Sequence, residues 1–184
     1  MVLFFESSHE FQHDFQTSTL AFFNRYPNPF AKHVLSSDTI EQYIDEDGCL
    51  RVTKVIVKSG RLPNFIKPFL GTSVNSWIIE KSITNPKTNT LMSYTANVDH
   101  RKFIKVEEYL TYYTADHNED ITLLDAKVKF SSNLFGFKQK IEQWSHRRFS
   151  SNLHNTREGL KYVMNRLQQT GGIWQVDETV TSLN

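Results

Sequence analysis

The chain has 184 residues, 39% of them hydrophobic and 22% charged, which is the size and composition of one folded globular domain rather than a disordered chain. Its single cysteine, Cys49, excludes an intramolecular disulfide framework and a multi-cysteine zinc site. The formal net charge of +1 argues against a protein that binds extended nucleic acid.

The first 131 residues of the chain predict mainly strands. A short strand is expected at residues 2–6, and a helix at 14–25 with Asp14 as its N-cap and Pro27 limiting its end. Six further segments are dense in β-branched and aromatic residues that alternate with polar ones. These expected strands are 33–44, 50–58, 74–84, 90–98, 103–114 and 121–131. Because short turns join most of them, we expect antiparallel neighbours.

The remaining segments are an insertion, a long helix and a tail. Residues 59–72 interrupt the strands, and apolar residues at helical spacing predict one long helix from about 133 to 169. Residues 170–184 are expected to be a flexible tail after a domain of residues 1–169. A sheet with one apolar face covered by a long helix is an α+β fold, which can enclose a cavity.

The small net charge hides three blocks. Residues 1–47 hold two basic and eight acidic residues, residues 48–79 hold five basic residues and no acidic one, and residues 127–166 hold nine basic and two acidic residues. The blocks either form a localised positive site or neutralise each other after folding. No apolar stretch is long enough for a membrane span, and the N-terminal residues predict neither a secretory signal nor an Arg-rich presequence.

Lys58 is the first candidate for binding an anion. In the strand 50–58 it shares one face with Lys54 and with two apolar residues. One interpretation places Lys58 at the mouth of an apolar cavity, where it binds a charged headgroup together with Arg61. The alternative is that the lysines lie at the strand ends and are solvated.

The insertion at 59–72 contains two prolines and five large apolar residues. As a lid, it would close a lipid cavity and touch a bilayer when open, with flanking cations attracted to anionic lipid. As a connecting segment, it would simply pack on the core. The residues expected to contact a membrane are Leu62, Phe65, Ile66, Lys67 and Phe69.

Four further residues have both a functional and a structural interpretation. Arg25, followed by a proline-rich loop with His33, could bind phosphate through its planar fork of donors, or it could interact only with the helix dipole. In the long helix, Trp144 and Arg148 share a face. They either line a groove that ends in a positive charge, or Arg148 lays its aliphatic stem on the core with its head in water.

Sequence signatures of enzymes are missing. The chain has no nucleophile elbow, P-loop, zinc-protease motif or dinucleotide-binding glycine turn, and its seven histidines show no spacing typical of metal ligands. The residues therefore predict a protein that is not an enzyme and that needs no cofactor or metal.

Several segments together resemble the PRELI family, and most of all its fungal branch, which carries phosphatidic acid between mitochondrial membranes. They are FFNRYPNPFAKHVLSSDTIE, KSGRLPNFIKPFLG, SWIIEKSITNP, KVEEYLTYYT and IEQWSHRRF, in one register over residues 1–168. The resemblance implies a seven-stranded antiparallel sheet gripping a long C-terminal helix around a lipid cavity, as in StAR and phosphatidylinositol transfer proteins.

The resemblance also implies a function. It is the non-enzymatic transfer of phosphatidic acid from the outer to the inner mitochondrial membrane, in the intermembrane space, in support of cardiolipin synthesis. The implied partner is a small helical protein with twin Cys-x-nine-Cys motifs, and contact with anionic membranes is transient. Transfer of phosphatidylserine or another phospholipid, an enzyme on the same fold, and a structural adaptor with a filled cavity stay open.

Residue by residue, the resemblance implies that Arg25, His33 and Lys58 bind the headgroup. Arg61 and Arg148 occupy positions at which the fungal branch has lysine, so the charge is kept while the donor geometry changes. Asn155 replaces a basic residue of that branch, which puts the role of this position in doubt, and His154 beside it is a candidate substitute. Leu62, Phe65 and Phe69 match the family's lid.

Overall fold

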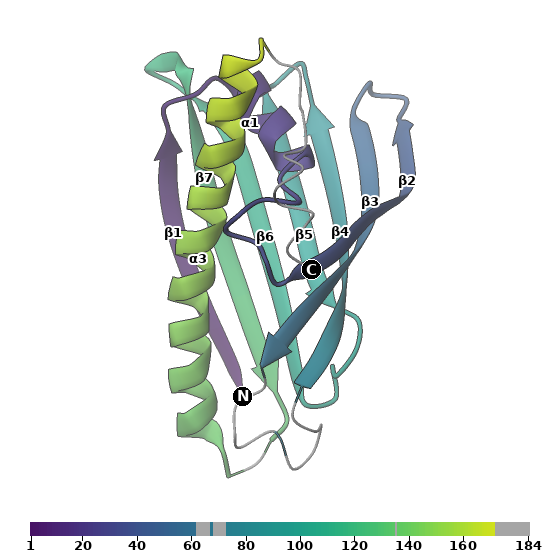
Figure 1. The fold of residues 1–184 in the computed structure, drawn as a ribbon, viewed down its shortest axis with the longest axis vertical. Coiled ribbons are helices and arrows are strands. Elements are labelled where there is room, and N and C mark those ends of the chain that lie inside the picture. Colours follow the sequence, from purple (N-terminus) through teal and green to yellow (C-terminus); the bar gives the residue numbers. More distant parts are fainter. Residues whose placement is uncertain (62–66, 68–72, 135, 172–184) are drawn as a thin grey trace.

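The computed structural model describes residues 1–61, 67, 73–134 and 136–171 of the chain (Figure 1). Most of the insertion and most of the expected tail lie outside these ranges. No helix in the described ranges is both long enough and apolar enough to cross a membrane.

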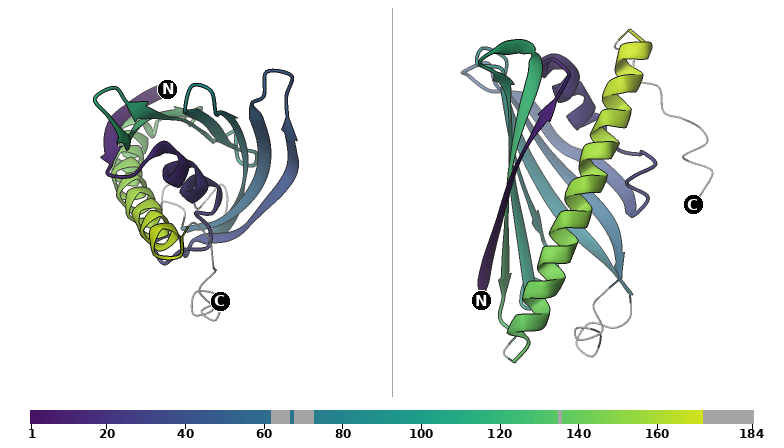
Figure 2. Two further views of the ribbon diagram at one scale, coloured as in Figure 1. Left: turned by 90° about the horizontal axis from the view of Figure 1, so that it is seen from above. Right: turned by 90° about the vertical axis from the view of Figure 1, so that its left-hand side faces the viewer.

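Seven antiparallel strands form one sheet in the order β1-β7-β6-β5-β4-β3-β2. Consecutive strands from β2 to β7 are neighbours, and β1 pairs with the last strand, so the sheet curls into a half-barrel (Figure 2). The strands are β1 (Val2–Phe11), β2 (Val34–Ile44), β3 (Leu50–Arg61), β4 (Ser73–Asn85), β5 (Thr90–Asn97), β6 (Ile104–Ala115) and β7 (Asn118–Ser132). The expected fold class is confirmed.

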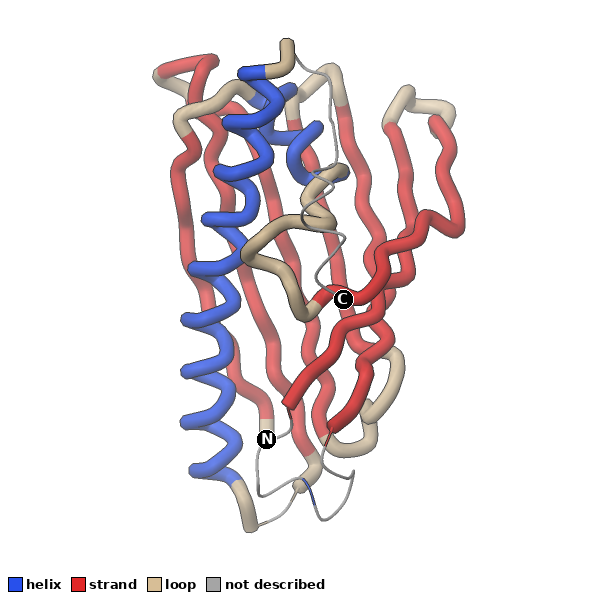
Figure 3. The backbone as a smooth tube through the Cα atoms, in the orientation of Figure 1, coloured by secondary structure: helices blue, strands red, loops and turns tan. Residues whose placement is uncertain are grey.

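Two helices occupy the concave side of the sheet (Figures 2 and 3). In α1 (Phe15–Phe23), the Thr17 amide donates to Asp14 Oδ1 at 2.8 Å, which confirms the expected N-cap. The long helix α3 (Lys138–Gln169) buries an apolar stripe that includes Ile141 and Leu160. Its start is later than expected because residues 133, 134, 136 and 137 are not helical, and Gly136 has a φ of 83°.

The hydrophobic core fills only one end of the half-barrel. There α1 and the C-terminal half of α3 pack on the sheet, and Phe22, Tyr112 and Met164 are almost fully buried. This end is the top of Figure 1. Toward the other end α3 continues along the sheet without α1 between them, which leaves room for a cavity.

The first strand is longer than expected. Residues 2–11 pair in continuous register with β7, from Val2 opposite Ser131 to Phe11 opposite Thr122. The polar run after Phe5 gave little indication of a strand. The neighbouring strand β7 supplies the backbone hydrogen bonds for these residues. Pairing with β7 therefore outweighs their weak intrinsic preference for a strand.

The segment after α1 is fixed against α3 at Gly159. Asn28 is buried, its side-chain amide donates to the Arg25 carbonyl, and its Oδ1 accepts from the Phe30 amide at 2.8 Å. A methyl group added at Gly159 would lie 3.0 Å from this side chain. Glycine therefore allows α3 to approach the loop that carries Arg25 and His33.

Candidate functional site

A cavity of about 230 Å³ lies between the concave face of the sheet and the N-terminal half of α3. Apolar side chains make up most of its wall: Ile78, Ile104, Val106, Val128, Phe130, Trp144, Phe149 and Leu153. Trp144 is in edge-to-face contact with Phe130, with ring centroids 6.2 Å apart. The cavity therefore offers the dry, aromatic and aliphatic surface that hydrocarbon chains prefer.

Two cations from opposite walls face this cavity. Lys58 comes from β3 and Arg148 from α3. Within the part of the chain that the structure describes, neither side chain has an ion-pair or hydrogen-bond partner. Burial lowers the pKa of Arg148, so its charge is held at a cost in solvation that an anionic ligand would offset.

His33 lies with these two cations and lines the same cavity. Burial lowers the pKa of its imidazole to about 4, and the charges of Lys58 and Arg148 act in the same direction. The imidazole of His33 is therefore neutral at neutral pH in this environment. A neutral imidazole can donate one hydrogen bond to a phosphate oxygen, and an added anion would favour its protonated form.

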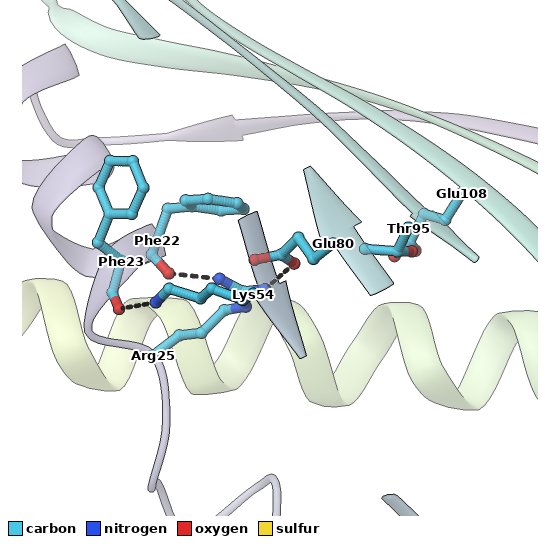
Figure 4. A network of polar contacts seen from close by, with 7 residues as sticks. All are labelled: Phe22, Phe23, Arg25, Lys54, Glu80, Thr95 and Glu108. Atoms are coloured by element: carbon cyan, nitrogen blue, oxygen red, sulfur yellow. Dashed lines mark hydrogen bonds and ion pairs between the residues drawn. The ribbon is translucent and has the colours of Figure 1, made fainter. Parts of the chain in front are cut away.

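Arg25 lies in a different environment. It is 8% exposed, ion-paired with the buried carboxylate of Glu80, and donates to the Phe22 carbonyl at 2.5 Å (Figure 4). Burial by itself would lower the pKa of this guanidinium, but the charges of Glu80 and Tyr26 outweigh it and raise the pKa. The structure thus gives Arg25 a compensating partner inside the protein.

Arg25 lines a second, smaller cavity of about 80 Å³ that adjoins the first. The two cavities share His33, Lys58, Thr95, Glu108 and Asn152 among their lining residues. The smaller one is largely polar, and Asn155 from α3 is part of its wall. His154 is exposed and lines neither cavity, so the structure does not support it as a substitute for a basic residue at position 155.

Lys54 shares the inner face of β3 with Lys58 but is not free. Its Nζ atom donates to the Phe23 carbonyl at 2.9 Å, at the end of α1 (Figure 4). Burial and the nearby Arg25 lower the pKa of Lys54, while Glu80 acts in the opposite direction. Of these two neighbouring lysines, only Lys58 is available to a ligand, and the strand pattern alone does not distinguish them.

Glu108 is a site residue that the sequence interpretation missed. It lines both cavities from β6, and burial raises the pKa of its carboxyl although Lys58 and Arg25 oppose the shift. The signal was present in the run KVEEYL, where Val106, Glu108 and Leu110 fall on the face opposite Glu107. Reading these residues as the inner face would have placed a carboxyl beside the cations.

The remaining sequence candidates are placed only in part. The backbone of Arg61 pairs with Ser73, where β3 ends and β4 begins, while the side chain of Arg61 lies outside what the structure describes. Lys67 is half-buried. Leu62, Phe65, Ile66 and Phe69 lie outside the described residues, so the lid stays a prediction.

Solved structures of known proteins share this fold. TTHA0849 from Thermus thermophilus aligns with a TM-score of 0.59 at 11% identity, covering 89% of this chain and 98% of that one. The Zhui aromatase/cyclase from a Streptomyces species aligns with a TM-score of 0.54 at 9% identity, over 94% and all of the respective chains. A START superfamily protein from Mycobacterium smegmatis has a TM-score of 0.51 at 16% identity, covering 89% of this chain and 98% of that one. These likenesses establish a helix-grip fold.

Sequence relatives are much closer. The chain is 46% identical over 170 residues to "Protein UPS1, mitochondrial" of Saccharomyces cerevisiae, covering 92% of this chain and 97% of the relative. It is 36% identical to the "Protein ups1 homolog" of Schizosaccharomyces pombe, covering 84% of this chain and 91% of the relative. It is 31% identical to the human "PRELI domain-containing protein 1, mitochondrial", covering 80% of this chain and 68% of the relative. The model of the PRELI-like family matches residues 16–170, and the chain belongs to this family.

Proposed function

We propose that this protein carries phosphatidic acid between the outer and inner mitochondrial membranes without changing it chemically. The observation that carries the proposal is an apolar cavity that Lys58 and Arg148 line, neither of them in an ion pair or hydrogen bond within the described chain. Relationship to mitochondrial proteins of the PRELI-like family supports a role in mitochondrial lipid transfer. We infer that the protein is not an enzyme.

The chemistry of phosphatidic acid suits such a cavity. Its phosphomonoester carries between one and two negative charges near neutral pH, as other phosphate monoesters do. Lys58 and Arg148 can offset its dehydration, because charge-assisted hydrogen bonds are about twice as strong as neutral ones. The acyl chains gain about 0.8 kcal/mol for each buried CH₂ group. Both terms must stay moderate for the lipid to be released.

The cellular setting follows from the same family relationship. We infer that the protein acts in the intermembrane space, peripherally at the inner membrane, where its cargo supports cardiolipin synthesis. Its expected partner is a small helical protein with twin Cys-x-nine-Cys motifs, bound as a heterodimer. The insertion between β3 and β4, with Lys67, is the segment expected to contact anionic membranes.

A transfer assay tests the cargo. The full-length chain with its partner is mixed with donor liposomes that contain labelled phosphatidic acid and phosphatidylserine, and with unlabelled acceptor liposomes. We expect transfer of phosphatidic acid well above a protein-free blank and above that of phosphatidylserine. Preferential transfer of phosphatidylserine would support the alternative cargo, and no acceleration for either lipid would refute the proposal.

A second measurement separates transfer from chemistry. Mass spectrometry of the lipid before and after incubation is expected to give identical masses. An altered lipid would instead support an enzyme on this fold. Native mass spectrometry of the purified complex is expected to show bound phospholipid, and a protein without any bound lipid after incubation with the liposomes would support a structural adaptor.

A further inference from the structure

Glu108 occupies an unusual place for a carboxylate in a site that is otherwise suited to an anion. Among the described residues that line the larger cavity, it is the only acidic one, and it lines that cavity together with Lys58 and Arg148. It also lines the smaller cavity, next to Glu80 and Tyr112. A carboxylate here repels a fully ionised phosphate, so its presence calls for a chemical reason.

The sheet register fixes Glu108 in this position. Lys54 is opposite Glu80, Glu80 is opposite Thr95, and Thr95 is opposite Glu108, so a row of polar side chains crosses the inner face from β3 to β6 (Figure 4). Lys54 donates a hydrogen bond to the Phe23 carbonyl at the end of α1, and Glu80 is ion-paired with Arg25 in the loop that follows. Glu108 is the member of the row at the cavity.

The carboxyl of Glu108 is almost unpartnered. Thr95 Oγ1 donates to its Oε2 at 3.4 Å, and within the described chain it makes no other hydrogen bond or ion pair. The Tyr112 hydroxyl in the smaller cavity is buried and has no hydrogen-bond partner among the residues that the structure describes. A half-buried carboxyl with free acceptor capacity is placed to accept a hydrogen bond from a bound ligand.

The charges around Glu108 come from several elements. The titratable groups that line the two cavities together with Glu108 are Lys58 of β3, Glu80 of β4, His100 between β5 and β6, Tyr112 of β6, Arg148 of α3, and Arg25, Tyr26 and His33 of the segment between α1 and β2. Burial raises the pKa of Glu108, Lys58 and Arg25 lower it, and Glu80 raises it. Protonated and ionised forms are therefore closer in free energy than for a solvated carboxyl.

We propose that Glu108 determines headgroup specificity by sharing one proton with the phosphomonoester of the lipid. This proposal rests on the proposed function. The proton lies between a phosphate oxygen and a carboxylate oxygen, and no bond to phosphorus forms or breaks. A phosphomonoester supplies this proton because its second ionisation lies near neutral pH, at about pH 6 for phosphorylated side chains.

A phosphodiester headgroup supplies no proton for this hydrogen bond. Its phosphate has no second ionisable oxygen, so an ionised Glu108 faces an anion with no P–O–H donor between them. This is discrimination by an unfavourable contact with the wrong ligand, in addition to a favourable one with the right ligand. Sites that hydrogen-bond a hydroxyl reject analogues without it much more strongly than apolar pockets reject a missing methylene.

The test is a headgroup ratio measured with Glu108→Gln. Donor liposomes contain equal labelled amounts of phosphatidic acid and phosphatidylglycerol, and the full-length protein with its partner transfers both in one mixture. The ratio of the two rates cancels effects on docking to the membrane. Glutamine keeps the size of the side chain but donates from its NH₂ group to phosphate oxygens of either class.

At pH 6.5 we expect the ratio of phosphatidic acid to phosphatidylglycerol to fall about tenfold or more in Glu108→Gln, mainly through faster transfer of phosphatidylglycerol. Glu119→Gln, the same change at an exposed position of β7, is the matched control and should keep the wild-type ratio. An unchanged ratio in a folded Glu108→Gln would overturn the proposal.

The wild-type protein provides a readout that needs no variant. Between pH 6.5 and pH 8.5 its ratio should fall, because the shared proton is lost, whereas the ratio of Glu108→Gln should not fall. A wild-type ratio that stays constant over this range also refutes the proposal. Absence of phosphatidic acid transfer by the wild-type protein would refute the proposed function itself, which is a different result.

Discussion

Arg25 and Glu80 form a buried ion pair that joins the loop after α1 to the middle of the sheet, 55 residues away in the sequence. The carboxylate of Glu80 compensates the positive charge of Arg25 inside the protein. Its neighbours Lys58 and Arg148 have no such partner in the described chain. Cations of the same formal charge thus divide into one that holds the fold and two that are left for a ligand.

Removal of Glu80 should destabilise the protein strongly. Glu80→Gln leaves the Arg25 guanidinium buried without its counter-ion, and we expect a loss of about 3 kcal/mol in the free energy of unfolding. Urea denaturation measures it. Glu6→Gln removes one partner of the exposed pair with Lys127 and should cost less than about 1 kcal/mol. Equal effects of the two substitutions would show that the pair is not a structural element.

Reversal of charge at Lys58 should act on transfer and not on folding. Lys58→Glu places a second carboxylate in the cavity wall beside Glu108, which disfavours an anionic headgroup, and we expect transfer of phosphatidic acid to fall at least tenfold. Because Lys58 has no partner in the described chain, the unfolding free energy should change little. Lys81→Glu on the outer face of β4 is the control. Unchanged transfer in Lys58→Glu would remove this residue from the site.

His33 should make the lipid-free protein less stable in acid. Its pKa in the folded protein is about 4, below the ordinary value of 6.5, so the unfolded chain binds the proton more readily. Stability from this group is complete above about pH 6.5 and is lost as the pH falls toward 4. His9 and His13 also have lowered pKa values, so His33→Gln removes only part of the dependence.

An NMR titration of the His33 imidazole measures this pKa directly. A value near 4 is expected without lipid, and a higher one with a bound phosphomonoester, because an adjacent anion favours the charged imidazolium. His33→Gln removes the signal of this imidazole and thereby assigns it. A lipid-free His33 that titrates near 6.5 would contradict the buried, positively charged environment.

A larger side chain at Val106 should block the cavity. Val106→Trp directs an indole from β6 into the space that acyl chains would occupy, and we expect less bound lipid in native mass spectra and at least tenfold slower transfer. Val98 is 56% exposed, so Val98→Trp is the matched control. Normal lipid loading of a folded Val106→Trp would show that the lipid binds elsewhere.

Gly159→Ala should destabilise the protein although alanine favours helices. The intrinsic gain is about 1 kcal/mol, but the added methyl would lie 3.0 Å from Asn28, whose side chain holds the loop between α1 and β2. Overpacking of this kind costs about 1–3 kcal/mol, so we expect a net loss. Ser151→Ala, at an exposed position of α3, should change stability little. A more stable Gly159→Ala would show that Asn28 can move without cost.

Much of the fold was predictable because strands and helices each give a characteristic local spacing of apolar residues. The alternation in segments such as 50–58 and 121–131 identified β3 and β7, and the spacing of Ile141, Trp144 and Leu160 identified α3. The N-cap at Asp14 was predictable because capping depends on residues only three apart. The later end of β1 was not, since its hydrogen bonds come from a strand more than 100 residues away.

The site was predictable only as a set of residue types. The sequence by itself determined a basic stretch around Lys58, an apolar face with Trp144 on the long helix, and a resemblance to the PRELI family. Only the tertiary structure decided which charges are compensated, because Glu80 and the Phe23 carbonyl reach Arg25 and Lys54 from distant parts of the chain. It also placed Glu108 among the cations, since closure of the sheet around α3 brings β3, β6 and the helix to one cavity.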